Sequence, residues 1–283
     1  MQFTDSHCHL DDITFQQQLP ELLTQCQRLS IQRIIIPATS PDNFEQVLNL
    51  AKRYNDHAVK LYPCLGIHPW YLDNLNEDHL KQLTSKVQKA RNNIIALGEI
   101  GIDGANIKRS QAPEKELAKQ QHFFDYQLNL AKQEELPVII HHRQSHDKII
   151  PLLKKYQLTR AGVIHGFTGS YQQAKDYLDL GFKLGIGSTI TYARAKKTIN
   201  TLKRVPIESL LLETDAPAMP LSKELDNVIE QDQLTQGLTS NEPAINYPLK
   251  IIQIFNVLSQ IRPESTNDIA KQLESNVEQL FFC

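Results

Sequence analysis

Eight short apolar runs, separated by longer segments of helical periodicity, constrain the fold of this chain more than any other feature. The runs lie at 3–9, 33–38, 60–67, 94–101, 137–143, 162–167, 182–188 and 209–215. Apolar strands that alternate with helices are typical of a parallel sheet buried on both faces. Before the fifth run, for example, Leu117, Phe124, Leu128 and Ala131 recur at helical spacing. Eight such units predict a closed (β/α)8 TIM barrel.

An open, doubly wound sheet is the main alternative fold, and the sequence argues against it. No G-x-G-x-x-G motif follows any of the apolar runs, as a dinucleotide-binding sheet would require. A length of 283 residues fits one barrel, and no linker or internal repeat marks a boundary. We therefore expect one domain over 1–283. The long stretch 216–243 is the exception to short connections, and it suggests a lid, a binding loop or a mobile excursion.

Charge and targeting signals narrow the classes of function. Lys and Arg number 30 against 32 for Asp and Glu, so no global basic field exists to hold nucleic acid, and any polyanion must bind locally. The start lacks a signal peptide, and no apolar run reaches the ~18–20 residues that span a bilayer, which predicts a cytoplasmic protein without membrane contact. Cys8, Cys26, Cys64 and Cys283 have no C-x-x-C spacing and are expected to be free thiols.

Ionisable residues stand near the C-terminal ends of the apolar runs, where apolar residues are expected. They are His7, His9, Glu99, His141, His165 and Asp215. A lone strand-end residue of this kind is often a helix cap or a hydrogen-bonded core histidine. In a parallel barrel, however, all strand ends open on one face, so the six would share one buried cup that needs a cation. The set predicts a metal site, and because a carboxylate can bridge, it predicts two ions.

Several motifs in the chain occur in an order typical of one family. The chain reads DSHCHL at 5–10, GIHP at 66–69, GEIGID at 98–103, LPVIIHHR at 136–143, GVIHGFTGS at 162–170, ETDAP at 213–217 and NEP at 241–243. This ordered set resembles the TatD family of metal-dependent hydrolases, within the amidohydrolase-like barrels. No lysine stands at the strand-four position, where related barrels carry a carbamylated lysine.

The resemblance implies a ligand set and an activity. One ion would be held by His7, His9, Glu99 and Asp215, and the second by Glu99, His141 and His165, with Glu99 as the bridge. The implied activity is that of a divalent-metal-dependent deoxyribonuclease, a 3'→5' exonuclease on single-stranded DNA. The expected catalytic residues are Asp215, as the base that orients a water, and Glu99; a helix cap is the structural alternative for Asp215. The metal stays open between Mg, Mn and Zn.

Four further residues are candidates for substrate binding, each with a structural alternative. Arg143 shares a face with His141 and either binds a phosphate or pairs with a carboxylate of the barrel wall. Thr168 and Ser170 begin a helix whose N–H groups suit a phosphate, or they simply cap it. His68 contacts substrate or ends the third strand. Asp5 and Glu213 are expected to support the ligands, because a metal-bound imidazole typically donates its other N–H to a carboxylate.

The substrate is the least constrained prediction. Many relatives have an aromatic pair after GLD and a basic GKR before NEP, where this chain reads GIDGAN and GLTS. Both are common means of holding single strands. DNA or another phosphoester is therefore the predicted partner, and no protein partner can be inferred. The alternatives are a small-molecule amidohydrolase or esterase on the same barrel, and a metal-binding protein with vestigial catalysis.

Overall fold

Eight parallel strands form the centre of the molecule in a computed structural model, which describes residues 1–225 and 245–283. The strands are β1 (Phe3–Asp5), β2 (Ile31–Pro37), β3 (Lys60–Cys64), β4 (Leu97–Asp103), β5 (Val138–Arg143), β6 (Gly162–Ile164), β7 (Lys183–Ile186) and β8 (Leu210–Leu212). Each lies within or overlaps one of the eight predicted runs.

The strands close into a barrel through two seams. Hydrogen-bonded ladders run in the order β1-β2-β3 and β4-β5-β6-β7-β8. An isolated parallel bridge between Leu65 and Leu97 joins the two ladders on one side. On the other side the Ser6 amide donates to the Leu212 carbonyl at 2.9 Å, next to β1 and β8. The predicted (β/α)8 barrel is confirmed.

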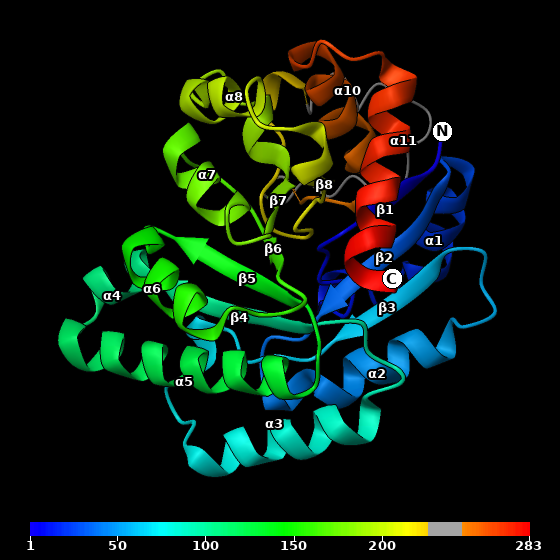
Figure 1. The fold of residues 1–283 in the computed structure, drawn as a ribbon. Helices are drawn as coiled ribbons and strands as arrows, with labels where there is room; N and C mark the ends of the chain where they lie inside the picture. The colour runs from blue at the N-terminus through cyan, green and yellow to red at the C-terminus, as the bar shows by residue number, and fades with distance from the viewer. Residues whose placement is uncertain (226–244) are drawn as a thin grey trace.

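Helices surround the strands, with α2, α3 and α5 on one side of the barrel and α7, α8 and α10 on another (Figure 1). They are α1 (Leu19–Arg28), α2 (Phe44–Arg53), α3 (Glu77–Ala90), α4 (Gly104–Arg109), α5 (Pro113–Gln133), α6 (His146–Tyr156), α7 (Tyr171–Leu178), α8 (Lys196–Leu202), α10 (Ile251–Ile261) and α11 (Thr266–Val277). The predicted periodic segment 117–131 lies within α5, which begins at a proline whose missing N–H costs nothing in the first turn.

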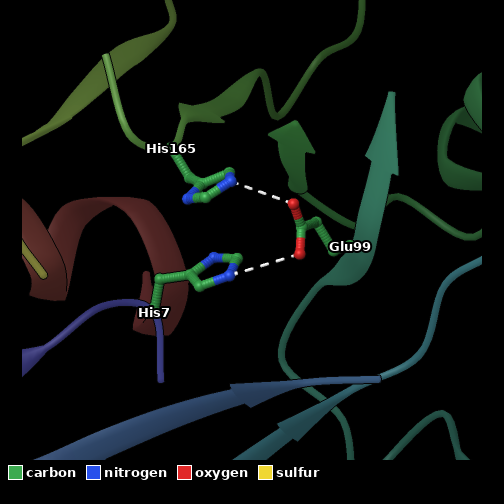
Figure 2. A group of neighbouring side chains, drawn as sticks. All are labelled: His7, Glu99 and His165. Atoms are coloured by element: carbon green, nitrogen blue, oxygen red, sulfur yellow. Dashed lines mark ion pairs between the residues drawn. The ribbon is translucent and has the colours of Figure 1, made fainter. Parts of the chain in front are cut away.

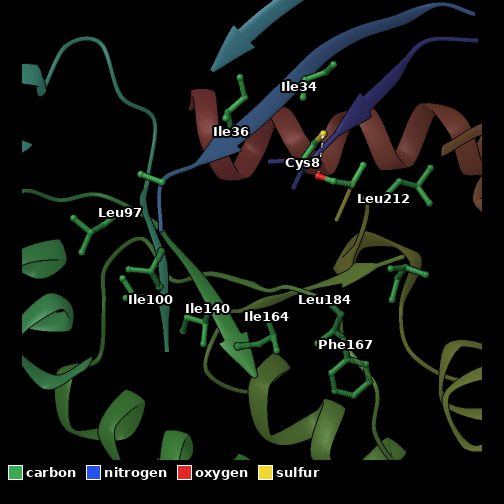
Figure 3. Packing of buried hydrophobic residues seen from close by; sticks show 14 of the residues in the cluster. Cys8, Ile34, Ile36, Leu97, Ile100, Ile140, Ile164, Phe167, Leu184 and Leu212 are labelled. Atoms are coloured by element: carbon green, nitrogen blue, oxygen red, sulfur yellow. Dashed lines mark hydrogen bonds between the residues drawn. The ribbon is translucent and has the colours of Figure 1, made fainter. Parts of the chain in front are cut away.

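Strand alternation separates two apolar layers. Ile34 and Ile36 belong to the large cluster between strands and helices, whereas Ile35 belongs to a smaller cluster inside the barrel. Figure 3 shows side chains of the outer layer from several strands. The inner cluster also includes Leu280 and Phe281, from the π-helical turn Glu278–Phe282 that follows α11. The C-terminus of the chain therefore supplies part of the barrel's interior packing.

A bulge in β4 determines where Glu99 points. Leu97 pairs with Val138 and Ile100 pairs with Ile140, so β4 has one residue more than β5 over this interval. Leu97 and Ile100 both pack in the outer layer, and the extra residue allows Glu99 between them to face the interior. Glu99 was expected near the C-terminal end of its strand, but it is the third residue of β4, which continues past the bulge to Asp103.

Three remaining predictions concern the chain outside the barrel core. All four cysteines are free, as predicted. No helix among the described residues has the length and apolar character needed to cross a membrane. Most of the long stretch 216–243, including the NEP motif, lies outside the described residues.

Candidate metal centre

A pocket of about 530 Å³ opens where the C-terminal ends of the strands meet. Five of the six predicted metal ligands line it directly, and His7 lies beneath them, fully buried. Three groups of side chains within this centre have donor atoms within 4.8 Å of one another, as a metal site requires. The structure thus brings together the six residues that the sequence singled out.

The first side of the centre is formed by the two histidines that follow β1. His7 Nε2 and His9 Nε2 lie 3.2 Å apart. Each lies 3.5 Å from Asp215 Oδ1, and their distances to Glu99 Oε2 are 3.3 and 3.5 Å. Although β1 ends at Asp5, before both histidines, their rings still converge as expected for residues two apart in extended chain.

The other oxygen of Glu99 faces a second group of imidazoles. Glu99 Oε1 lies 2.9 Å from His165 Nε2, 3.0 Å from His141 Nδ1 and 3.3 Å from His68 Nε2. Figure 2 shows the carboxylate with one oxygen directed at His165 and the other at His7. A single buried carboxylate therefore separates two groups of nitrogen donors.

The donor set differs at His68. Its Nδ1 accepts a hydrogen bond from the backbone N–H of Trp70 at 3.0 Å, so in the neutral ring the hydrogen is on Nε2. Burial lowers the pKa of His68 to about 4, and the ring is neutral near pH 7. A nitrogen that carries hydrogen donates a hydrogen bond and has no lone pair for a metal. Nε2 of His68 lies 3.3 Å from Glu99 Oε1, and its contact with a substrate stays a prediction.

Asp5 fixes the backbone on which the first group is built. Its carboxylate accepts hydrogen bonds from the Thr214 amide at 2.9 Å, the Thr214 hydroxyl at 2.5 Å and the His7 amide at 3.3 Å. Burial raises the pKa of Asp5 to about 8. Its expected contact with an imidazole ring is absent among the described residues, because both oxygens are turned toward backbone and hydroxyl donors. Asp5 thus joins the ends of β1 and β8.

Glu213 lies beside the second group, near the nitrogen of His165 that is turned away from Glu99. Its Oε1 accepts a hydrogen bond from the Gly166 amide and lies 3.5 Å from His165 Nδ1. A Cβ atom at Gly185 would collide with this carboxylate, so the neighbouring strand β7 needs glycine there. At 3.5 Å the carboxylate and the ring are within ion-pair distance, but Nδ1 of His165 has no hydrogen-bond partner among the described residues.

Asp103, Trp70 and Tyr71 are site residues that the sequence reasoning missed. Asp103 Oδ2 accepts from Trp70 Nε1 at 2.6 Å and lies 3.2 Å from His141 Nε2. Trp70 and Tyr71, in the 3₁₀ turn Pro69–Tyr71, line the pocket. Two signals could have found them: Asp103 closes the GEIGID motif, and the aromatic pair directly follows His68-Pro69.

The electrostatics of the centre favour positive charge. Burial opposes the ionised form of Glu99, yet the surrounding imidazoles outweigh it and hold its pKa well below the usual range. Burial alone would lower the pKa of His9, but hydrogen bonds to Asp215 and Glu99 raise it to about 10. The pKa of His165 is raised by Glu99 and Glu213 in the same way. Without a metal, protons supply the charge that the carboxylates attract, so the donor set fits divalent cations.

Asp215 has a strained backbone, with φ of 58° in the left-handed region that non-glycine residues rarely adopt. Its amide donates to the His7 carbonyl at 2.8 Å, which fixes this conformation. Hydrogen bonding to His9 outweighs burial and lowers the pKa of Asp215, so the carboxylate is ionised near neutral pH. Strain of this kind is concentrated at functional sites.

The other substrate-binding candidates lie outside the lining of this pocket. Arg143 Nη1 lies 3.8 Å from Asp103 Oδ2, which is the barrel-wall pairing that the sequence left open. Ser170 caps α7, its hydroxyl accepting from the Gln173 amide. Thr168 is exposed in the turn before that cap. The N-terminus of α7 is thus capped by its own side chain.

Comparison with known proteins identifies the family. Residues 4–282 match the family model described as TatD related DNase. The chain is 39% identical to the uncharacterized metal-dependent hydrolase YjjV of Escherichia coli K12, over 99% of this chain and 97% of that protein. The crystal structure of YjjV, described as a TatD homolog, superposes on this structure with a TM-score of 0.86. The match covers 99% of this chain and 98% of the YjjV chain. The human deoxyribonuclease TATDN3 is 27% identical over 79% of this chain and 81% of its own length. The chain belongs to the TatD family of metal-dependent hydrolases.

Proposed function

We propose that this protein hydrolyses phosphodiester bonds of DNA as a 3'→5' exonuclease on single strands, with two divalent cations in the centre. The observation that carries the proposal is the position of Glu99. One of its oxygens faces His7 and His9, and the other faces His141 and His165. A carboxylate shared in this way could serve two cations, one on each oxygen.

The ligands divide between the two oxygens of Glu99. His7, His9 and Asp215 would hold one ion with Oε2, and His141 and His165 would hold the other with Oε1. Mixed nitrogen and oxygen donors suit Mg, Mn or Zn. A pair of such cations supplies Lewis-acid polarisation and charge neutralisation at a phosphoryl group.

The protein's own groups position the reactants. The ionised carboxylate of Asp215 is partly open to the pocket, where it can orient the attacking water and accept its proton. The neutral His68 ring also lines the pocket, and its Nε2–H, which lies 3.3 Å from Glu99 Oε1, could donate to a phosphoryl oxygen that approaches this carboxylate. Both groups have the protonation state that these roles need near pH 7.

The support for DNA as the substrate that comes from related proteins consists of the names that some of them carry. The human and fission yeast relatives are named deoxyribonucleases, at 27% and 26% identity. One observation favours a second candidate, a hydrolase of small esters or amides: Asp11 and Asp12 line the pocket, while its described lining includes no lysine or arginine. The vestigial alternative requires a degraded ligand set, whereas all six predicted ligand positions carry donors.

End-labelled single-stranded DNA separates these candidates. The metal-loaded protein should shorten 5'-labelled strands stepwise and release labelled mononucleotide at once from 3'-labelled strands. His142→Phe is the matched control, since His142 is adjacent to His141 but faces the helices, and it should keep this activity. Glu99→Gln should abolish it. Turnover of small esters or amides without DNA cleavage would favour the second candidate and contradict the proposal.

A further inference from the structure

Trp70 and Tyr71 form an exposed aromatic wall in the pocket, and the proposed mechanism does not use it. Each keeps 51% of its surface accessible. Both line the same pocket as Glu99, His141 and Asp215. Trp70 and Tyr71 are adjacent in the chain, so the two rings place flat apolar surface at one edge of the pocket. Exposed aromatic faces beside a reactive centre are surfaces for stacking.

A hydrogen bond to a buried carboxylate holds the indole of Trp70 in place. Its Nε1 donates to the buried Asp103 at 2.6 Å, and the same oxygen lies 3.2 Å from His141 Nε2. The His68 ring meets the indole edge-on, with centroids 5.2 Å apart, and meets Tyr71 at 5.9 Å. An aromatic ring anchored at one edge loses little conformational freedom when a ligand stacks on its open face. The wall is therefore pre-organised for a planar group.

The described lining of the pocket has acidic side chains and no lysine or arginine; the guanidinium of Arg143, which pairs with Asp103, is not part of this lining. Proteins that hold extended single strands track the backbone with a positively charged groove. Here Asp11 and Asp12 line the pocket, and no lysine or arginine does so among the described residues. The sequence of residues 226–244 contains none either. Phosphates beyond the reacting one would find no cationic side chain in this lining.

We infer that Trp70 and Tyr71 are specificity-determining residues that stack on the nucleobase of the substrate's terminal unit. The inference rests on the proposed function and deepens it. The protein would recognise one nucleobase next to one phosphoester. The affinity for a ligand should therefore depend on whether it carries a base, and should change little with the length of the strand. A nucleotide at the end of a strand, or a short oligonucleotide, fits this requirement.

The only tryptophan of the chain, Trp70, provides the measurement. Indole fluorescence of the Mg²⁺-loaded protein is titrated with deoxyadenosine 5'-monophosphate and with deoxyribose 5-phosphate, which has the same sugar and phosphate without the base. The base-bearing ligand should change the fluorescence and bind about tenfold more tightly or better, the gain that stacking on aromatic side chains provides. Equal affinities of the two ligands would overturn the inference.

Variants separate stacking from a general effect on the pocket. Tyr71→Leu keeps Trp70 as the fluorescent reporter. It should reduce severalfold the ratio of the affinities for deoxyadenosine 5'-monophosphate and deoxyribose 5-phosphate, and it should raise KM for short oligonucleotides more than it lowers kcat. Trp70→Leu removes the fluorophore, so its ligand binding is measured by calorimetry, and it should reduce the same affinity ratio. Ile13→Ala removes apolar surface of the same pocket without removing a ring, and should leave the ratio between the two ligands within about twofold. A ratio unchanged by both aromatic substitutions contradicts the inference.

Strand length provides a second criterion. Dissociation constants for two-, four- and eight-nucleotide strands should agree within a few fold, whereas a backbone-tracking site would gain affinity with each added phosphate. A steep gain with length would overturn the inference. Phosphodiester turnover without base dependence refutes this inference alone, and base-dependent binding without any phosphoester turnover refutes the proposed function alone.

Discussion

His141 and His142 are neighbours on β5, yet they have opposite environments. The His141 ring faces Glu99 and Asp103 inside the barrel, and hydrogen bonds to these carboxylates outweigh burial and raise its pKa. His142 packs on the helix side, 5.5 Å from the Tyr177 ring, and neither ring nitrogen has a hydrogen-bond partner among the described residues. Burial lowers the pKa of His142 to about 3.

The difference shows that strand alternation decides which of two identical side chains takes part in chemistry. A histidine that faces carboxylates attracts a cation, whether a proton or a metal. A histidine that faces aromatic rings stays neutral and behaves as a core residue. The predictions below test this division between the inner and outer faces of the barrel.

The largest effect is expected on the inner face at Glu99. Glu99→Gln keeps the size of the side chain but removes the negative charge between two groups of imidazoles. We expect both ions to bind more weakly and hydrolysis to fall at least ~10³-fold. Metal stoichiometry by elemental analysis and single-turnover rates measure this. If two ions stay tightly bound in Glu99→Gln, the bridging role is wrong.

Asp215→Asn should separate metal binding from chemistry. Among the described residues of the centre, the Asp215 carboxylate pairs with His7 and His9. The second ion should therefore be retained, while the hydrolytic step falls by about 10²–10⁴-fold because the proton acceptor is lost. Equal loss of both ions would show that the two halves of the centre cannot be separated.

The metal affinity of the inner face should rise with pH. The pKa of His9 is raised to about 10 by Asp215 and Glu99 despite burial, so this ring holds a proton over the neutral range when no metal is bound. A metal must displace that proton, which predicts a gain of about tenfold in affinity per pH unit from pH 6 to 8. Competition with a chromophoric chelator measures it. Affinity independent of pH over this range would contradict the high pKa.

Asp103→Asn tests a carboxylate that acts through His141. It should weaken the second ion about 10–100-fold, as loss of an outer carboxylate partner typically does, and it should alter the fluorescence of Trp70, which donates to the same oxygen. The matched control is Asp176→Asn, whose carboxylate lies 3.0 Å from His146 Nε2 on the helix side. That variant should bind both ions normally. Similar losses in the two variants would remove the distinction between the faces.

The smallest effect is expected at His142. Its folded pKa of about 3 lies below the ordinary value of 6.5, so the neutral form stabilises the fold above pH 6.5 and this contribution is lost as pH falls toward 3. His142→Phe should leave activity within about twofold and stability at pH 7 within about 1 kcal/mol. It should be more stable than the original protein at pH 5. Urea unfolding at both pH values measures this; a parallel loss in both proteins would contradict the assignment.

The sequence was sufficient for the barrel and for the set of candidate ligands, because period, order and strand-end position carry that information. The convergence of His7 with Asp215 follows from the closure of any eight-stranded parallel barrel. The inward position of Glu99 does not follow, since it depends on a bulge that apolar patterning cannot reveal. Simple alternation from Ala96, which packs inside the barrel, would turn Glu99 outward.

The roles of residues that depend on particular side-chain partners were harder to predict from the sequence. Asp5 was expected to contact a ring and instead binds the backbone and hydroxyl of Thr214. The sequence carried no prediction for Trp70, because its bond to Asp103 joins positions far apart in the chain. Such contacts are determined by the three-dimensional arrangement of turns, for which the sequence has no periodic signal.

The position of the metal centre at the seam between β1 and β8 suggests that a bound ion would also stabilise the fold. The first and last strands meet through few backbone bonds, among them Ser6 to Leu212 and Asp215 to His7. An ion held by His7, His9 and Asp215 would join the two ends of the barrel wall, and would act as a crosslink that closes a very long loop. Loading the centre should then slow amide hydrogen exchange at Ser6 and Asp215 more than at the interior of β5. An ion at this seam would then stabilise the closed barrel in addition to taking part in hydrolysis.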